Sequence, residues 1–108
     1  MSREATIVRV YIHEAEHGRR RTLMEELMGI LHDRQRVKGA TVFRGIAGFG
    51  ASGEVHTADL LRLNAELPLV IEFFDTPEVV AQVMPQIAAI VPGDHIISWT
   101  VQLRGPAG

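Results

Sequence analysis

Two short motifs in the first half of the chain have residue types and spacing that could carry chemistry. The segment HEAEH at residues 13–17 matches H-E-x-x-H, with which some proteases bind zinc and activate water. That chemistry needs both histidines on one face of a helix, whereas this motif follows a strand pattern and runs into Gly18. We interpret it as a polar loop and keep His13, Glu14 and His17 as candidate ligands of a non-catalytic metal.

The second motif is rich in glycine. Residues 48–53, GFGASG, match the G-x-G-x-x-G pattern of dinucleotide-binding proteins, and Glu72 and Asp75 follow at roughly the twenty-residue spacing of that fingerprint. A doubly wound nucleotide-binding fold has about six strands, which is more than this chain can form. We expect these glycines to permit positive φ angles and a close approach of backbone N–H groups to an anion or another chain.

The glycine motif opens a long connection between two strand patterns. About twenty residues separate the strands, more than the ~12–15 at which unstructured connections become uncommon and usually functional. We expect a ligand, a neighbouring subunit or a partner protein to order this loop. His56 is either solvated or a contact to a ligand or subunit. The other candidate contacts to a ligand or partner in the loop are Phe49, Ser52, Thr57 and Asp59.

Other residues give no catalytic set. His32 and His95 are interpreted as structural and Trp99 as a core residue. No Ser-His-Asp order and no close pair of carboxylates stands out. We therefore expect that the protein is not an enzyme, and the sequence identifies no cofactor.

Composition limits the class of protein. The 108 residues suit one domain, since domains commonly have about 100–150 residues. The absence of cysteine excludes disulfides and thiolate chemistry. A net charge of −2 argues against nucleic-acid binding. No apolar run reaches the ~18 residues of a membrane span and no signal peptide is recognisable, so we expect a cytoplasmic protein without membrane insertion.

Periodicity predicts four strands and two main helices. The strands are expected at residues 5–13, 40–46, 67–74 and 95–103. The first helix carries an apolar stripe and ends before Gly39; it begins either near Thr22 or a turn earlier. The second begins at Thr76 as N-cap with Pro77 at its first position. Pro85 should kink or break this helix, and a short helix is expected at residues 57–64.

The order strand, helix, strand, strand, helix, strand predicts an α+β fold of the ferredoxin-like βαββαβ type. Both helices should cover one face of the sheet. The other face is expected to carry a mixture of apolar and charged side chains that suits contact with other subunits better than contact with water: Arg9, Tyr11, Val70, Glu72 and Phe74.

The segment TVFRGIAGFG, followed by HTADLLRL and LPLVIEFFD, resembles a known family. It is similar to the uncharacterised PII-like proteins grouped as domain of unknown function one-ninety, relatives of the PII nitrogen-signalling proteins. PII proteins carry Gly-Phe-Gly at the base of a long loop and then Leu-Pro before the third strand, which Gly48-Phe49-Gly50 and Leu67-Pro68 match. The resemblance covers nearly the whole chain and implies a single PII-like domain at residues 1–108.

The resemblance also implies a function. PII proteins are ring-shaped homotrimers that hold a nucleotide between subunits, and their long loop, here residues 48–66, reaches a partner protein. Genes of relatives are often associated with membrane transport proteins, which suggests a transporter as partner. By position, the implied ligand contacts lie at the loop base, in the turn before the last strand and near the C-terminus: Arg44, Gly45, Gly48, Gly50, Gly93, Asp94 and Arg104.

One departure concerns the turn before the last strand. PII proteins have a phosphate-binding lysine there, whereas this chain has Asp94 and His95. A neutral histidine replaces a fixed cation poorly, so we expect a small anionic ligand with less charge than a triphosphate, such as another adenine nucleotide or a related metabolite. Two alternatives stay open: a divalent-metal-binding trimer like the CutA proteins, using His13, Glu14, His17 or His56, and a small enzyme with an interface active site.

Overall fold

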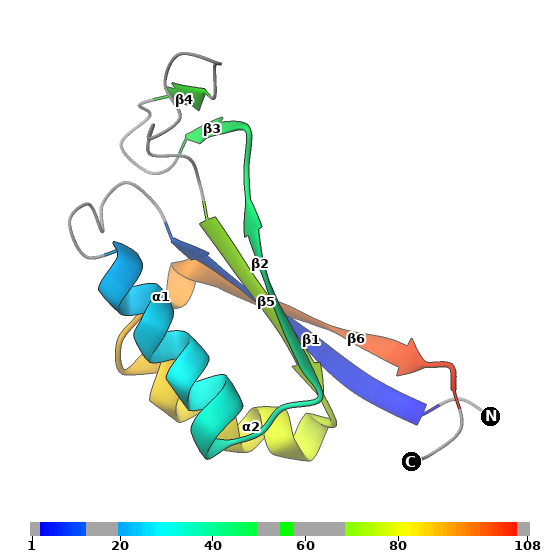
Figure 1. Cartoon of the computed structure of the whole chain (residues 1–108). Helices are drawn as coiled ribbons and strands as arrows, with labels where there is room; N and C mark the ends of the chain where they lie inside the picture. The colour runs from blue at the N-terminus through cyan, green and yellow to red at the C-terminus, as the bar shows by residue number, and fades with distance from the viewer. Residues whose placement is uncertain (1–2, 13–19, 50–54, 58–68, 106–108) are drawn as a thin grey trace.

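The computed structural model describes residues 3–12, 20–49, 55–57 and 69–105, which form a sheet covered on one side by helices (Figure 1). The sheet is antiparallel throughout, with the strand order β2-β5-β1-β6. Its strands are β1 (Arg3–Ile12), β2 (Gly39–Arg44), β5 (Leu69–Asp75) and β6 (Ile96–Leu103). The helices α1 (Arg20–Met28) and α2 (Pro77–Ala88) follow β1 and β5. The predicted ferredoxin-like α+β fold is confirmed, and strand bounds differ from the predicted ones by at most two residues.

The first helix changes its winding before it ends. It begins at Arg20, the earlier of the two predicted starts, and continues from Met28 into the π-helix η2 (Gly29–Arg34). The backbone N–H of Gln35 donates to the carbonyl of Ile30 at 3.0 Å, which closes the last wide turn. The helix ends before Gly39, as predicted, and its apolar stripe is buried: Leu23, Leu27, Ile30 and Leu31.

The second helix has the predicted start and is continuous. The Oγ1 of Thr76 accepts a hydrogen bond from the N–H of Val79 at 3.2 Å, and Pro77 is the first helical residue. Of the two predicted effects of Pro85, a break does not occur, because the helix runs through this residue to Ala88; the kink stays a prediction. Proline removes the donor for the carbonyl of Ala81, but both residues are exposed, so water can satisfy that carbonyl.

The face of the sheet beneath the helices, here called the covered face, holds the core. Alternate residues of β1 and β5 point into it, as the strand periodicity predicts. They pack with both helices into one cluster that includes Val8, Val10, Ile12, Ile71, Phe73, Leu27, Val83 and Ile87. Each of the largest of these side chains is less than 2% exposed.

The opposite face, here called the open face, is formed by the residues between those of the core. The strand register pairs Ile7 with Phe74 and Trp99, Arg9 with Glu72 and Ile97, and Val70 with Tyr11 and Phe43. The five side chains predicted on this face therefore share it. The prediction that Trp99 is a core residue is wrong: it lies on the open face and is 39% exposed.

A buried carboxylate joins the two layers at one end of the sheet. Asp75 ends β5 and accepts hydrogen bonds from the backbone N–H groups of Lys38 at 3.0 Å and Thr76 at 2.6 Å. It is 6% exposed. The carboxylate thus ties the segment that enters β2 to the residue that caps α2.

The long connection contains strands that periodicity did not predict. β3 (Ala47–Phe49) pairs with β4 (Val55–Thr57) in a separate antiparallel sheet. The helix predicted from Thr57 is therefore wrong at its start, because Thr57 ends β4; residues 58–64 lie outside the described part of the chain. Three-residue strands are too short to give a clear alternation of apolar and polar residues.

Candidate functional site

The loop base is built by the end of β2 and the hairpin that follows it. Arg44 is the last residue of β2, pairs with Leu69 and is exposed. In the hairpin, the register pairs Gly48 with His56, Phe49 with Val55 and Ala47 with Thr57. The structure therefore brings the first two residues of the glycine motif, Gly48 and Phe49, and the candidate loop histidine into one small sheet. Three further candidates, Gly50, Ser52 and Asp59, lie outside the described residues.

The turn before β6 is the second part of the site. The predicted turn is confirmed as a short 3₁₀ helix, η3 (Gly93–His95), in which Gly93 and Asp94 are exposed. The side chain of His95 is only 13% exposed, and its Nε2 lies 4.0 Å from the Oδ1 of Asp94. This burial agrees with the structural role predicted for His95. The corresponding prediction for His32 is wrong, because its side chain is 85% exposed and its Nδ1 lies 2.8 Å from the Oδ1 of the neighbouring Asp33, whose side chain is also exposed.

A side chain on Gly93 would fit within its own chain. A Cβ placed there would meet no heavy atom within 4 Å. Internal packing therefore gives no reason for glycine at this position. Open space next to exposed backbone is what a closely approaching ligand or second chain needs.

These two parts of the site share one end of the sheet, and Arg104 lies at the other. Leu69 pairs with both Arg44 and Ile12, and the start of β6 at Ile96 pairs with Val10, so β2 ends at the end of the sheet where β6 begins. The eight residues of β6 then run about 26 Å away. Figure 1 shows the β3–β4 hairpin and the end of β6 at opposite ends of the molecule. Arg104 is thus too far away to share a small ligand with Arg44 of its own chain.

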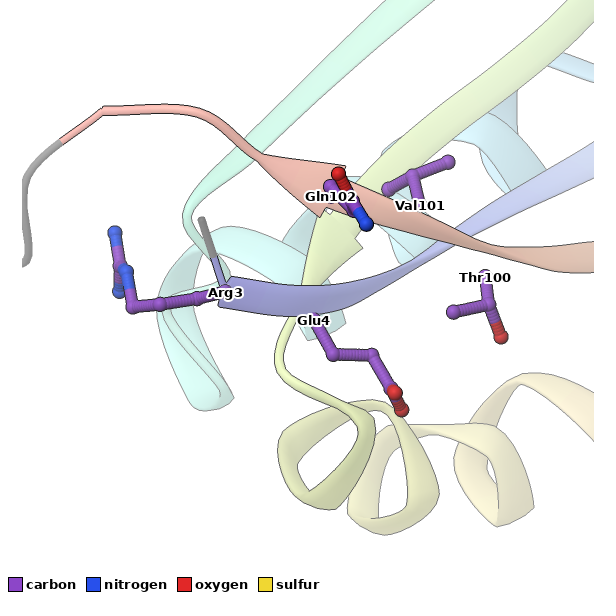
Figure 2. Close-up of a pocket in the computed structure, with 5 residues that line it drawn as sticks. All are labelled: Arg3, Glu4, Thr100, Val101 and Gln102. Atoms are coloured by element: carbon purple, nitrogen blue, oxygen red, sulfur yellow. The ribbon is translucent and has the colours of Figure 1, made fainter. Parts of the chain in front are cut away.

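The end of the sheet near Arg104 has its own hollow. There β1 and β6 extend as a pair, since β5 pairs with β1 only from Thr6 onward. A cavity of about 410 Å³ lies beside this pair of strands and is lined by residues of both. Figure 2 shows Glu4 and Thr100 on one side and Arg3 pointing away from them. The lining residues are Arg3, Glu4, Thr100, Val101 and Gln102.

The centre of the open face carries a paired charge. The Nε of Arg9 lies 2.7 Å from the Oε1 of Glu72, and the guanidinium carbon lies 5.3 Å from the centre of the Trp99 ring. The carboxylate of Glu72, together with the hydroxyl of Tyr11, raises the pKa of Arg9 above its ordinary value. Sequence patterns placed Arg9 and Glu72 on this face. They missed Trp99. In β6, Ile97 and Trp99 alternate with polar residues, and the pairing of β6 with β1 puts both of them on the open face.

Of the candidate metal ligands, only His56 lies in the described part of the chain, on β4. His13, Glu14 and His17 lie outside the described ranges, and among the residues that are described no group of three or more His, Asp or Glu side chains is close enough to hold an ion. Within the same ranges, none of the helices combines the length and the apolar character needed to cross a bilayer.

This arrangement of sheet and helices is a PII-like fold. CPII of Thiomonas intermedia K12, a nitrogen regulatory PII-like protein solved with ADP, AMP and bicarbonate, is similar with a TM-score of 0.67 and 17% identity, covering 95% of this chain and 91% of CPII. The divalent ion tolerance protein CutA1 of Ehrlichia chaffeensis is similar with a TM-score of 0.56 and 16% identity, covering 95% of this chain and 84% of CutA1.

Sequence comparison places the chain more narrowly. The model of the DUF190 family, described as an uncharacterized ACR, matches residues 5–103. A UPF0166 protein of Methanocaldococcus jannaschii is 32% identical over 97 residues, which cover 90% of this chain and 88% of that protein. The chain belongs to the DUF190 family, the domain of unknown function one-ninety that its sequence resembles.

Proposed function

We propose that the protein is a PII-like regulator that binds a small anionic ligand, an adenine nucleotide or a related metabolite, between two copies of the chain. The observation that carries this proposal is that the candidate ligand contacts lie at two opposite ends of the sheet. Arg44, Gly93 and Asp94 lie at one end of the sheet and Arg104 lies about 26 Å away at the other. A ligand that uses all four residues must therefore take Arg104 from a neighbouring copy. The ADP, AMP and bicarbonate in the similarly folded CPII support this class of ligand.

The residues have distinct roles in this proposal. Arg44 and the neighbour's Arg104 would pair with the anionic groups of the ligand, since a guanidinium forms paired hydrogen bonds with phosphate. Gly45 and Gly93 would let backbone N–H groups approach it. Asp94 would repel a highly charged ligand, which favours a mono- or diphosphate over a triphosphate.

The long connection would transmit binding. The glycines at 48 and 50 belong to the base of the 48–66 segment, which would present Phe49, Ser52, His56, Thr57 and Asp59 to a partner protein, for which a membrane transporter is our proposal. A ligand shifts such a segment only if it contacts its two states differently. In this proposal Arg44 makes the contact that differs between the two states, because it lies four residues before the segment and would contact the ligand.

Mixed assemblies test the proposal directly. Arg44→Ala and Arg104→Ala should each weaken binding of ADP and AMP at least about tenfold, since each removes a charged hydrogen bond to the ligand. When equal amounts of the two variants are unfolded and refolded together, they should form mixed closed rings. About one interface in four should then combine an intact Arg44 with an intact Arg104 from the neighbouring copy. Calorimetry should then detect about a quarter of the ADP and AMP binding sites that the original chain has.

Arg34→Ala is the matched control, because Arg34 is exposed on η2 and belongs to neither part of the site. It should bind as the original chain does. The proposal is wrong if neither single variant changes the affinity for ADP and AMP. It is equally wrong if both single variants lose nucleotide binding and their mixture regains none, because the two arginines then do not meet at an interface between copies.

A further inference from the structure

The end of the first helix carries a concentration of positive charge. Arg34, Arg36 and Lys38 are exposed and are accompanied by one carboxylate, that of Asp33. Three positive charges and one negative charge give residues 32–38 a net charge of +2 when their histidine is neutral, whereas the whole chain has −2. Among the residues that the structure describes, none of the three cations has an ion-pair partner. Such a local excess of positive charge attracts anions.

A hollow lies beside this segment. It has a volume of about 440 Å³ and is lined by His32, Asp33, Arg36 and Val37, and small-molecule sites commonly have about 300–1,000 Å³. Figure 1 shows the end of α1, from which η2 continues, at the opposite end of the molecule from the β3–β4 hairpin. The six residues of β2 then span about 20 Å from this end to Arg44. The hollow is therefore separate from the loop base of its own chain.

Arg36 is held in a backbone conformation that arginine disfavours. Its φ is 49°, and within the described ranges no other residue except glycine has a positive φ. The N–H of Val37 donates to the carbonyl of Leu31 at 3.0 Å, which is a helix ending in which glycine usually takes the position of Arg36. Glycine would avoid the steric cost. A strained residue that the fold does not require points to a function for its side chain, and this side chain lines the hollow.

The helical turns that lead to Arg36 are also unusual. They form the π-helix η2, whose last wide turn is closed by the bond from the N–H of Gln35 to the carbonyl of Ile30. Short π-helical segments inside helices are rare and frequently lie at functional sites. The wide winding places His32 and Asp33 beside the hollow that Arg36 lines.

The polar groups around the hollow define the chemistry of a ligand. The guanidinium of Arg36 can only donate hydrogen bonds. A carboxylate only accepts them, so the Nδ1 of His32 donates to the Oδ1 of Asp33 at 2.8 Å. This leaves the Nε2 of the neutral ring and the second oxygen of Asp33 as acceptors. A ligand that satisfies all three side chains has an anionic group and hydroxyl groups, and the net positive charge favours an anion over a zwitterion.

We infer that this hollow is a second ligand site, which binds a small hydroxylated anion: a phosphate ester or a carboxylate of a polyol. Arg36 pairs with the anionic group through its guanidinium, and His32 and Asp33 accept hydrogen bonds from the hydroxyl groups. The side chains of His32 and Asp33 are 85% and 75% exposed, so the site is open to water and the affinity is millimolar. This site goes beyond the proposed function, because it shares no residue with the candidate nucleotide contacts.

NMR titration of the ¹⁵N-labelled full chain tests the site with defined probes. Glycerol 3-phosphate and glycerate carry hydroxyl groups beside a phosphate and a carboxylate, and at least one of them should shift the N–H signals of residues 32–37. The tighter of the two identifies the anionic group. Glycerol, which has no charge, should shift none of these signals. If neither anion shifts them, or if glycerol shifts them equally, the inference is overturned.

Arg36→Gly separates a role in binding from a role in the fold. It removes the guanidinium and relieves the left-handed strain, so the probes should bind at least about fivefold more weakly while the midpoint of urea unfolding rises by a few tenths of a molar. Arg34→Ala is the matched control, because Arg34 is exposed on η2 but does not line the hollow. It should weaken binding less than about twofold. Equal losses in the two variants would mean that the anion senses only the general charge, and a lower urea midpoint for Arg36→Gly would mean that Arg36 serves the fold; either result contradicts the inference.

The role of the acceptors is tested by a probe that lacks hydroxyl groups. Methyl phosphate should bind the original chain at least about threefold more weakly than glycerol 3-phosphate. Asp33→Asn replaces an acceptor oxygen by a donor and removes the opposing negative charge, so it should tighten methyl phosphate and reduce the preference for glycerol 3-phosphate. Equal affinity of the original chain for both esters would show that the hydroxyl groups are not recognised.

These outcomes are distinguishable from those of the proposed function. Arg44→Ala should lose ADP and AMP but keep the shifts that glycerol 3-phosphate causes, and Arg36→Gly should do the reverse. If Arg36→Gly weakens ADP and AMP as strongly as Arg44→Ala does, the hollow is part of the nucleotide site and the inference of a separate site is wrong. A chain that binds glycerol 3-phosphate here but neither nucleotide refutes the proposed function and leaves the inference intact.

Discussion

The two faces of the sheet are made by the same four strands, yet the side chains of one face are buried and those of the other are largely exposed. On β1, Val8 and Val10 are at most 1% exposed beneath the helices. On β6, Ile97 and Trp99 are 45% and 39% exposed on the other side. Both sets of residues are apolar, so composition alone does not explain the difference. Helix position does, because α1 and α2 both lie on the covered face (Figure 1).

The difference teaches that apolar residues in a strand need not belong to their own chain's core. A two-layer α+β domain has helices for only one face of its sheet. Apolar side chains on the remaining face are available to another molecule. The paired Arg9 and Glu72 fit this division, since a surface used for contact can keep charges that a core would exclude.

The largest expected effect is on the covered face. Phe73→Ala should lower the free energy of unfolding by about 3–5 kcal/mol, because it leaves a cavity in a cluster that is fully buried. Urea unfolding followed by far-UV circular dichroism would show it. Ile97→Ala, measured in the same way, should lower the free energy of unfolding by less than about 1 kcal/mol, because Ile97 is 45% exposed. Equal costs would contradict the contrast between the faces.

Much of this fold could be predicted from local patterns. The apolar stripe of the first helix and the Thr76-Pro77 start of the second are signals carried by neighbouring residues, and both are confirmed. The π-helix and the short strands β3 and β4 give no such signal. Trp99 was misplaced because alternation groups residues into two faces without saying which face the helices cover; only the pairing of β6 with β1 decides that.

The candidate site was predictable only in its parts. The resemblance to PII-like proteins supplied Arg44, Gly93 and Arg104 by position. That Arg44 and Arg104 lie at opposite ends of the sheet follows from strand register, which pairs residues far apart in the sequence. Register depends on long-range packing rather than on local spacing. For this reason no motif in the sequence shows that these candidate residues of one chain lie too far apart to share a ligand.

A second prediction concerns the carboxylate that ties the two layers together. Asp75→Ala should lower the free energy of unfolding by roughly 2–3 kcal/mol, since it removes the acceptor of the N–H groups of Lys38 and Thr76. Asp75→Asn keeps one acceptor oxygen and should cost less. Asp94→Ala, at an exposed aspartate, is the control and should change stability by less than about 0.5 kcal/mol. The same urea measurement compares all three.

A third prediction sharpens the contrast at a place where the open face is packed by its own chain. Gly39 pairs with Phe74, and a Cβ on Gly39 would lie 2.6 Å from the Cε1 of that ring. Gly39→Ala should therefore cost about 1–2 kcal/mol, because the Phe74 ring must move. Gly39→Ala combined with Phe74→Leu should recover part of this loss. Full additivity of the two substitutions would show that the ring is not the obstacle.

The smallest expected effect on stability is at the other glycine. Gly93→Ala adds a Cβ that meets nothing within 4 Å, so the free energy of unfolding should change by less than about 0.5 kcal/mol. The oligomeric mass should also stay the same, because Gly93 lies on η3 rather than on the open face. If a ligand approaches the backbone here, however, the methyl group must displace it, and the affinity for ADP and AMP should fall at least about tenfold. Unchanged affinity by calorimetry would remove Gly93 from the site and leave Arg44 and Arg104 to hold the ligand, whereas a loss of stability would mean that this glycine serves the fold.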